Sequence, residues 1–307
     1  MSILSKKLRA AIKAPSERLK KAQEFRAASD IDTSEIKTLC LAVGPYRNLT
    51  TLTASILFLH PNCQVLNHGA ARIFGDPRLD FLDHYSDEKF ENFLRFAVYI
   101  SGSGGRGKKG GSIIHSHAFD NEHPMAALYR ERFGEELTKP HIHSLFWKES
   151  LRTAQHIRNR NIDLGKIFTQ NNKLRFLLPI RNPIDCALSN KRTGHAKLFG
   201  LKKTSPVEKI LTAILEEILW YQDLKATYPD RFFEYFENDF TGTTADKLAE
   251  FLLLTPDNDW KQSVLQAFDI THPYQHEGEL VAFYRQQVET IFTDHPDFAA
   301  RLLSFAR

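Results

Sequence analysis

Leu177–Asn190 carries the sequence LLPIRNPIDCALSN, and this stretch decides the fold. Its apolar beginning is typical of a buried strand. Asn182 and Pro183 then favour the start of a helix, as an N-cap followed by proline at the first helical position. We therefore expect Arg181 and Ser189 near the carboxyl edge of a sheet, where both side chains can hold an anion.

A second strand–turn–helix lies upstream at Leu41–Thr51, with the sequence LAVGPYRNLTT. A helix N-terminus offers unpaired N–H groups and partial positive charge, which favour a phosphate. Arg47 adds a full charge to this turn, and Thr50 and Thr51 add hydroxyl donors. Without a ligand, this turn would be an ordinary strand–helix connection, and Arg181 would form a surface ion pair; both alternatives stay open. Two anion sites on one sheet predict a ligand with two separate phosphate groups.

Composition and charge set limits on the class of protein. The chain has 307 residues, of which 42% are hydrophobic and 25% charged, as in a soluble globular domain with a large core. A net charge of +4 fits an anionic ligand but does not by itself indicate nucleic acid. No apolar run approaches the roughly 18 residues of a membrane span, and we expect a cytoplasmic protein. Three cysteines at spacings that fit no zinc site predict reduced core thiols and no metal: Cys40, Cys63 and Cys186.

Short apolar strands alternate with helices along most of the chain. This alternation predicts an α/β fold, a three-layer sandwich with a central parallel sheet. The predicted strands are Thr38–Val43, Gln64–Asn67, Ser144–Trp147, Leu174–Ile180 and Phe232–Phe236. The predicted helices between them are Asn48–Leu59, Ser150–Arg160, Pro183–Arg192 and Pro206–Ala226.

Capping signals predict where several helices begin. Ser205, with a glutamate three residues later, predicts a capping box at the longest helix. Thr243 or Thr244 is predicted to cap the next helix. A helix at about Glu279–Phe292 is expected to close the chain.

The domain organisation follows from where the alternation stops. Residues 1–37 are rich in lysine and arginine and predict a basic helical leader, whose weak apolar stripe allows contact with an anionic lipid surface. Residues 38–307 are expected to form one domain with an insertion at about 83–140. The insertion contains a glycine-rich, basic run at 101–112.

The two turns together resemble the cofactor-binding motifs of sulfotransferases that use 3′-phosphoadenosine 5′-phosphosulfate (PAPS). The resemblance implies a P-loop NTPase-like sulfotransferase topology. It also implies that Arg181 and Ser189 hold the 3′-phosphate. The first loop would cradle the 5′-phosphosulfate through Arg47, Asn48, Leu49, Thr50 and Thr51.

Two further segments are similar to the same family. Leu145–Ser150 resembles its middle strand, which ends in a lysine, and Phe233–Phe240 resembles its late Tyr-Glu-Asp-Leu strand. The resemblance implies that Lys148 and Arg47 stabilise the transferring group. Leu49 departs from the pattern, because the family usually has glycine at this position.

A catalytic base is predicted at His68, which ends the second strand beside the first loop, where the family often has glutamate. A histidine titrates near neutral pH and can accept a hydroxyl proton, although a hydrogen-bonded loop histidine is an equal alternative. His117 is another candidate, in a segment that resembles the Lys-Thr-His strand of cytosolic sulfotransferases; with His115 it would share one strand face. Glu149 is the third candidate.

The sequence thus predicts transfer of a sulfuryl group from PAPS to a hydroxyl acceptor, with 3′,5′-adenosine bisphosphate (PAP) as the second product. The acceptor, whether a small molecule, a glycan, a lipid or a protein, stays open, as does the oligomeric state. One alternative is an ATP-dependent kinase that uses Gly102–Lys108, although Lys109 replaces the required Ser/Thr. A non-catalytic, nucleotide-binding descendant is the other, supported by Leu49 and the missing glutamate.

Overall fold

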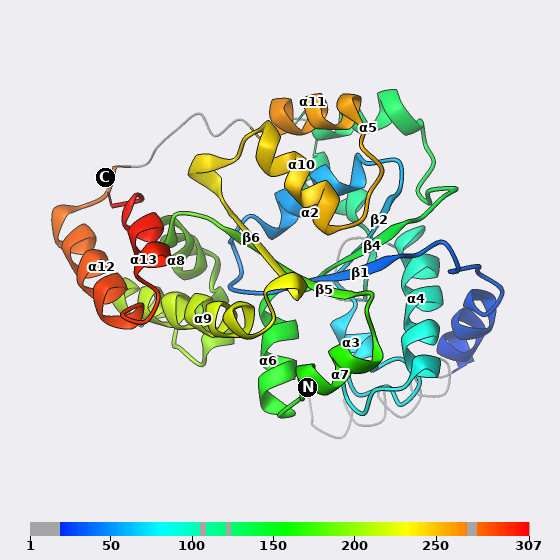
Figure 1. Ribbon diagram of the computed structural model, residues 1–307, viewed down its shortest axis with the longest axis horizontal. Coiled ribbons are helices and arrows are strands. Elements are labelled where there is room, and N and C mark those ends of the chain that lie inside the picture. The colour runs from blue at the N-terminus through cyan, green and yellow to red at the C-terminus, as the bar shows by residue number, and fades with distance from the viewer. Residues whose placement is uncertain (1–18, 105–108, 121–123, 269–274, 307) are drawn as a thin grey trace, which may run out of the picture.

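The computed structural model describes residues 19–104, 109–120, 124–268 and 275–306. A six-stranded sheet crosses its centre in the order β3-β2-β4-β1-β5-β6 (Figure 1). The strands are β1 (Thr38–Ala42), β2 (Cys63–Asn67), β3 (Gly111–Ser112), β4 (Ser144–Lys148), β5 (Leu174–Ile180) and β6 (Phe232–Phe236). All pairs are parallel except β3, which runs antiparallel to β2 at one edge. The predicted α/β fold with a central parallel sheet is confirmed, apart from this short edge strand.

The side chains of the strands divide the interior into two cores. Leu39 and Leu41 of β1 belong to one core, whereas Cys40 and Ala42 belong to the other. Because successive side chains of a strand point to opposite faces, both faces of the sheet are buried, and such strands read as continuous apolar runs. This is why the five longer strands were predictable to within a residue or two of their ends.

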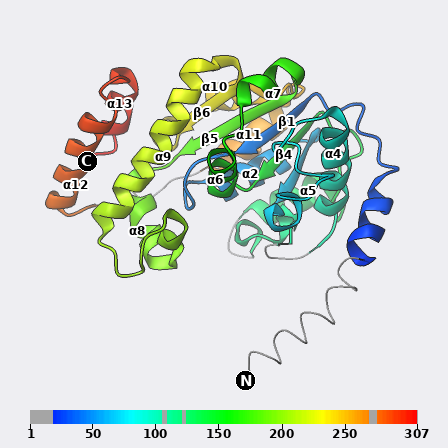
Figure 2. The same ribbon diagram turned by 90° about the horizontal axis from the view of Figure 1, so that it is seen from below.

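Helices cover both faces and complete the predicted three layers (Figures 1 and 2). The core that contains Cys40 and Ala42 is built against α2 (Thr50–Phe58), α5 (Met125–Phe133), α10 (Gly242–Phe251) and α11 (Asn258–Ala267). The other is built against α3 (Ala70–Ile73), α4 (Asp87–Ser101), α6 (Leu151–Asn159), α7 (Leu164–Gln170), α8 (Pro183–Thr193), α9 (Val207–Thr227), α12 (Gly278–Ile291) and α13 (Pro296–Leu303). None of the described helices is both long and apolar enough to cross a membrane.

Residues 83–140 contribute to this same sheet and core. Phe93 and Phe96 of α4 are fully buried in the core that contains Leu39 and Leu41, and β3 pairs with β2. Gln64 of β2 also donates a hydrogen bond to Ser101 Oγ of α4, at 2.9 Å. The division into a leader, a domain and an insertion stays a prediction, and residues 1–18 of the leader lie outside the described part.

Several predicted helix ends are wrong. Ser205 does not cap α9, because its hydroxyl accepts from the Lys202 N–H at 3.1 Å and the helix begins after Pro206 without a side-chain cap. The cap of α10 is Thr241, which forms a capping box with Thr244. α12 is not the last helix, since α13 follows it. The three cysteines are free and buried, as predicted.

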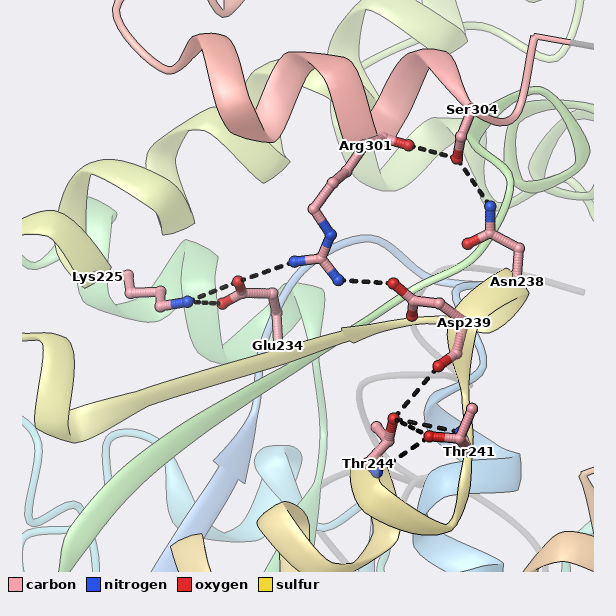
Figure 3. A network of polar contacts seen from close by, with 8 residues as sticks. All are labelled: Lys225, Glu234, Asn238, Asp239, Thr241, Thr244, Arg301 and Ser304. Carbon is pink, nitrogen blue, oxygen red and sulfur yellow. Dashed lines mark hydrogen bonds and ion pairs between the residues drawn. The ribbon is translucent and has the colours of Figure 1, made fainter.

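A polar network attaches the C-terminal helix to the end of β6 (Figure 3). Arg301 of α13 donates to Asp239 at 2.9 Å and lies 3.8 Å from Glu234, which also pairs with Lys225 of α9 at 2.5 Å. Ser304 accepts from the Asn238 amide at 2.8 Å. These contacts fix the short helix η5 (Glu237–Asp239).

Candidate functional site

A cavity of about 330 Å³ opens at the carboxyl edge of the sheet. Ligands of open α/β sheets bind at this edge, because the loops that follow parallel strands meet there. The turns after β1 and β5 that the sequence singled out both reach the cavity. Its walls are Tyr46, Arg47, Leu49, Thr50, Thr51, Leu52, Asn67, His68, Ser116, His117, Lys148, Arg181 and His195.

The turn between β1 and α2 has an unusual backbone. Arg47 and Leu49 have φ values of 66° and 59°, in the left-handed region that non-glycine residues rarely adopt. Leu49 is the N-cap of α2, and no side chain caps this helix. The first N–H groups of α2 are therefore available to an anion, beside the hydroxyls of Thr50 and Thr51.

Asn48 joins the two predicted turns instead of lining the cavity. Its side chain is only 1% exposed. The amide nitrogen donates to the carbonyl of Pro179 at the end of β5, and the amide oxygen accepts from the Arg181 N–H at 2.9 Å. Asn48 thus positions the first turn against the second.

The second turn has the predicted helix start. Asn182 caps α8 by accepting from the Ile184 N–H at 3.0 Å, with Pro183 at the first helical position. Ser189 lies behind the cavity wall, where its hydroxyl accepts from Arg47 Nε at 3.0 Å. The two predicted anion-binding sets are therefore in direct contact through their side chains.

Arg181 lies between two carboxylates at long distances. Its guanidinium is 3.9 Å from Asp185 and 3.8 Å from Glu237 of η5. Burial raises the pKa of Glu237 to about 7, and the nearby Arg181 opposes this shift. Neither contact reaches hydrogen-bond length, so the guanidinium keeps donors free to face the cavity.

The cavity is positively charged. Arg47, Lys148 and Arg181 line it, and no Asp or Glu is among the lining residues of the described chain. Lys148 is 7% exposed, and burial lowers its pKa to about 8 although Glu149 opposes the shift. Within the described residues its ammonium group has neither a hydrogen bond nor an ion pair. A desolvated amine without a directly bonded partner suits an anionic ligand.

The three candidate bases occupy different positions. His68 and His117 both line the cavity, and the side chain of His68 is 30% exposed. Glu149 is buried behind the wall, where it accepts from the Ala70 N–H at 3.1 Å and the Tyr46 hydroxyl at 3.3 Å. These bonds engage both oxygens of Glu149 and leave the two histidines as the groups at the surface of the cavity.

The predicted strand around His115 is wrong. Residues 113–119 form two 3₁₀ turns, η1 (Ile113–His115) and η2 (His117–Phe119), so His115 and His117 do not share a strand face. His115 does not line the cavity. In the described part of the chain no cluster of three or more His, Cys, Asp or Glu side chains could hold a metal.

Sequence reasoning did not assign several residues of the wall. Asn67 precedes His68 at a strand end, which is a usable signal. Ser116 and His195 had no signal, because they reach the cavity only through the fold. His195 stacks at a tilt on Tyr46, with ring centroids 5.6 Å apart.

The glycine-rich run lacks the geometry of a kinase loop. Residues 105–108, which include Arg106 and Lys108, lie outside the described chain. Beyond them the backbone enters β3 at Gly111. A Walker A lysine must be followed directly by a helix, and a strand follows here.

No family model matches the sequence, and no curated protein matches it. In structure the chain is similar to mouse sulfotransferase SULT7A1 complexed with PAP, at 9% identity over 92% of each chain with a TM-score of 0.42. It is also similar to sulfotransferase STF9 from Mycobacterium avium, at 14% identity over 90% of this chain and 79% of that chain, with a TM-score of 0.43. At such low identities and TM-scores the likeness carries no argument about activity, and it is a likeness of fold alone.

Proposed function

We propose that the chain is a sulfotransferase that moves a sulfuryl group from PAPS to a hydroxyl acceptor. One observation carries the proposal: three cations meet at an uncapped helix N-terminus in a cavity without carboxylates. Buried or partly buried cations bind phosphate and sulfate groups strongly, since charge-assisted hydrogen bonds strengthen as water is excluded. The cations are Arg47, Lys148 and Arg181.

The proposed contacts follow the two turns. The 5′-phosphosulfate would bind the N–H groups that follow Leu49, the hydroxyls of Thr50 and Thr51, and Arg47. The 3′-phosphate would bind Arg181. Ser189 would share this phosphate with Arg181 or orient Arg47, whose Nε it already holds.

The chemistry needs stabilised charge and a proton acceptor. PAPS supplies an electrophilic sulfur: a bond forms between the acceptor oxygen and sulfur while the bond between sulfur and the phosphate oxygen breaks. Lys148 and Arg47 would stabilise the negative charge that develops on the leaving phosphate, typically the largest contribution at such a centre. His68 would take the hydroxyl proton, with His117 as the alternative.

Two other functions make different predictions. A kinase would bind ATP with magnesium, and the strand after the glycine-rich run speaks against it. A non-catalytic descendant would bind PAP without turnover. We also infer a cytoplasmic location, which the three free cysteines support.

Isothermal titration with PAP tests the proposal. We expect wild type to bind PAP in the absence of magnesium, and Arg181→Ala and Lys148→Met to lose at least tenfold in affinity. Arg130→Ala and Lys166→Met, at exposed positions on α5 and α7, are the matched controls and should bind as wild type does. Transfer of labelled sulfuryl from PAPS then tests turnover. Binding of ATP–magnesium in preference to PAP would overturn the proposal, and PAP binding without transfer to any acceptor would favour the non-catalytic descendant.

A further inference from the structure

Two buried polar atoms in the cavity wall have no partner among the described residues. They are the side-chain oxygens of Asn67 and Ser116, and these residues are 4% and 6% exposed. Both residues line the cavity. Because buried polar groups in proteins are nearly always hydrogen-bonded, an unpaired oxygen on a residue that lines a cavity points to a ligand or a bound water as its partner.

The fold places Asn67 beside the proposed transfer point. It is the last residue of β2, and its partner in the parallel register with β4 is Lys148. Paired residues of neighbouring strands point to the same face, so the side chains of Asn67 and Lys148 leave the sheet side by side on one face. Asn67 is therefore placed to meet the acceptor and not the nucleotide.

Ser116 lies between η1 and η2, which follow β3 in the chain. Its backbone is fully paired: its N–H donates to Ile113 at 2.8 Å, and its carbonyl accepts from Phe119 at 3.1 Å. The hydroxyl is the one polar group of Ser116 that is unpaired among the described residues. No described segment of the chain supplies a partner for it.

The two groups require a ligand with specific chemistry. The carboxamide oxygen of Asn67 only accepts, so it needs an O–H or N–H donor, whereas the hydroxyl of Ser116 can donate and accept. A phenol or a sterol would present one hydroxyl and an apolar body, leaving these atoms unpaired. An ammonium-bearing acceptor would meet Arg47 and Lys148 with no carboxylate on the wall.

We propose that the acceptor is a polyhydroxy compound of the carbohydrate type. One hydroxyl reacts beside Lys148, and neighbouring hydroxyls on the same ring bond to Asn67 and Ser116. This inference rests on the proposed sulfotransferase function. A site built to pair a hydroxyl can discriminate against an analogue that lacks it by about 10⁴–10⁵-fold, so these two residues would determine specificity.

The test compares acceptors after PAP binding has been verified by titration. Labelled sulfuryl transfer from PAPS is measured with methyl glycosides of common hexoses, with 4-nitrophenol and with a long-chain alcohol. We expect transfer to glycosides and at least tenfold lower kcat/KM with the other two. Ser116→Ala and Asn67→Leu should each raise the KM for the glycoside at least tenfold, with PAP affinity unchanged within twofold.

Deoxy glycosides and a matched control complete the design. If a missing hydroxyl is the partner of Ser116, the corresponding deoxy glycoside should react equally with wild type and Ser116→Ala. Ser29→Ala, which removes a hydroxyl from an exposed turn, should behave as wild type.

The outcomes separate this inference from the function on which it rests. Failure to bind PAP would remove both. PAP binding with transfer to 4-nitrophenol or the alcohol, or with no transfer to any glycoside, would overturn the carbohydrate inference alone. An unchanged KM in Ser116→Ala and Asn67→Leu would show that these atoms bind water, and would overturn it as well.

Discussion

Replacing Lys148 by methionine should make the unliganded protein more stable while removing its activity. Burial lowers the pKa of this lysine from 10.5 to about 8, so the folded state holds the charged form less well than the unfolded chain does. At about 1.4 kcal/mol per pKa unit, the shift sets an upper limit of roughly 3 kcal/mol on the destabilisation by the charged amine. Methionine has a similar length and needs no counter-charge, so we expect Lys148→Met to raise the free energy of unfolding by about 1–3 kcal/mol at pH 7.

The pH dependence gives this prediction its sign. Below the folded pKa of about 8 the lysine is charged in both states, and its full destabilisation is present. As the pH rises from about 8 towards 10.5, the folded lysine is already neutral while the unfolded lysine still loses its proton, so the advantage of Lys148→Met shrinks. Urea unfolding of both proteins at pH 7, 9 and 10.5 measures this difference.

A second buried lysine provides the control. Lys139 lies among aromatic rings away from the cavity, with its amine 4.4 Å from the centroid of Tyr129, and burial lowers its pKa to about 6. Lys139→Met should also remove the cost of burying an amine, which at pH 7 is mostly deprotonated in the folded state, but it should leave PAP affinity and turnover as in wild type. A Lys148→Met protein that is less stable than wild type at pH 7, or a difference that does not change with pH, would refute the reasoning.

Three further predictions concern the turns around the cavity. Asn48→Ala leaves the Pro179 carbonyl and the Arg181 N–H unpaired, and should lower the free energy of unfolding by about 2 kcal/mol in urea and weaken PAP binding in titrations. Glu237 has a pKa raised to about 7, so its negative charge beside Arg181 grows between pH 6 and 8. The PAP affinity of wild type should therefore fall over this range. Glu237→Gln should bind PAP more tightly than wild type at pH 8, and its affinity should depend less on pH. Leu49→Gly should unfold with a free energy within about 1 kcal/mol of wild type, since relief of a left-handed φ offsets the lost packing. Leu49→Val should be less stable, because a β-branched residue tolerates this φ poorly. Thermal unfolding of the two variants measures this difference.

The main elements of the fold could be predicted because they depend on local pattern and simple burial. β5 is a continuous apolar run, and Asn182 and Pro183 mark the start of α8. β3 could not be predicted, since a two-residue strand has no periodicity and exists only through its pairing with β2. Ser205 and Glu208 have the spacing of a capping box, but the Ser205 hydroxyl accepts a hydrogen bond from Lys202 in the preceding turn.

The candidate site was predictable only in part, because it also depends on contacts between segments that are distant in the sequence. A charge at a strand end, such as Arg181 or Lys148, is visible in the sequence because the strand that carries it is visible. Asn48 was predicted to contact the ligand, and the sequence did not show that its amide also bonds to the Pro179 carbonyl, 131 residues further along the chain. Ser116 enters the wall through two 3₁₀ turns that have no sequence signature. Long-range geometry, which periodicity does not encode, decides which polar groups face the cavity.

Several energetically costly features of the described chain lie at this one edge of the sheet. Left-handed non-glycine residues follow three of its strands, one lysine is desolvated without a partner, and two buried oxygens are unpaired. Each could be removed by a single substitution, to glycine, methionine or alanine, and two cores that bury both faces of the sheet would still hold the fold together. Comparable features lie elsewhere in the described chain, among them the left-handed residues His84 and Asn161 and the desolvated Lys139, so their cost alone does not mark a binding site. The features at this edge differ from the others because they accompany a cavity lined by three cations, and this combination supports, independently of any family likeness, the proposal that the cavity binds an anion. The residues concerned that line the cavity are Arg47, Leu49, Asn67, His68, Ser116 and Lys148.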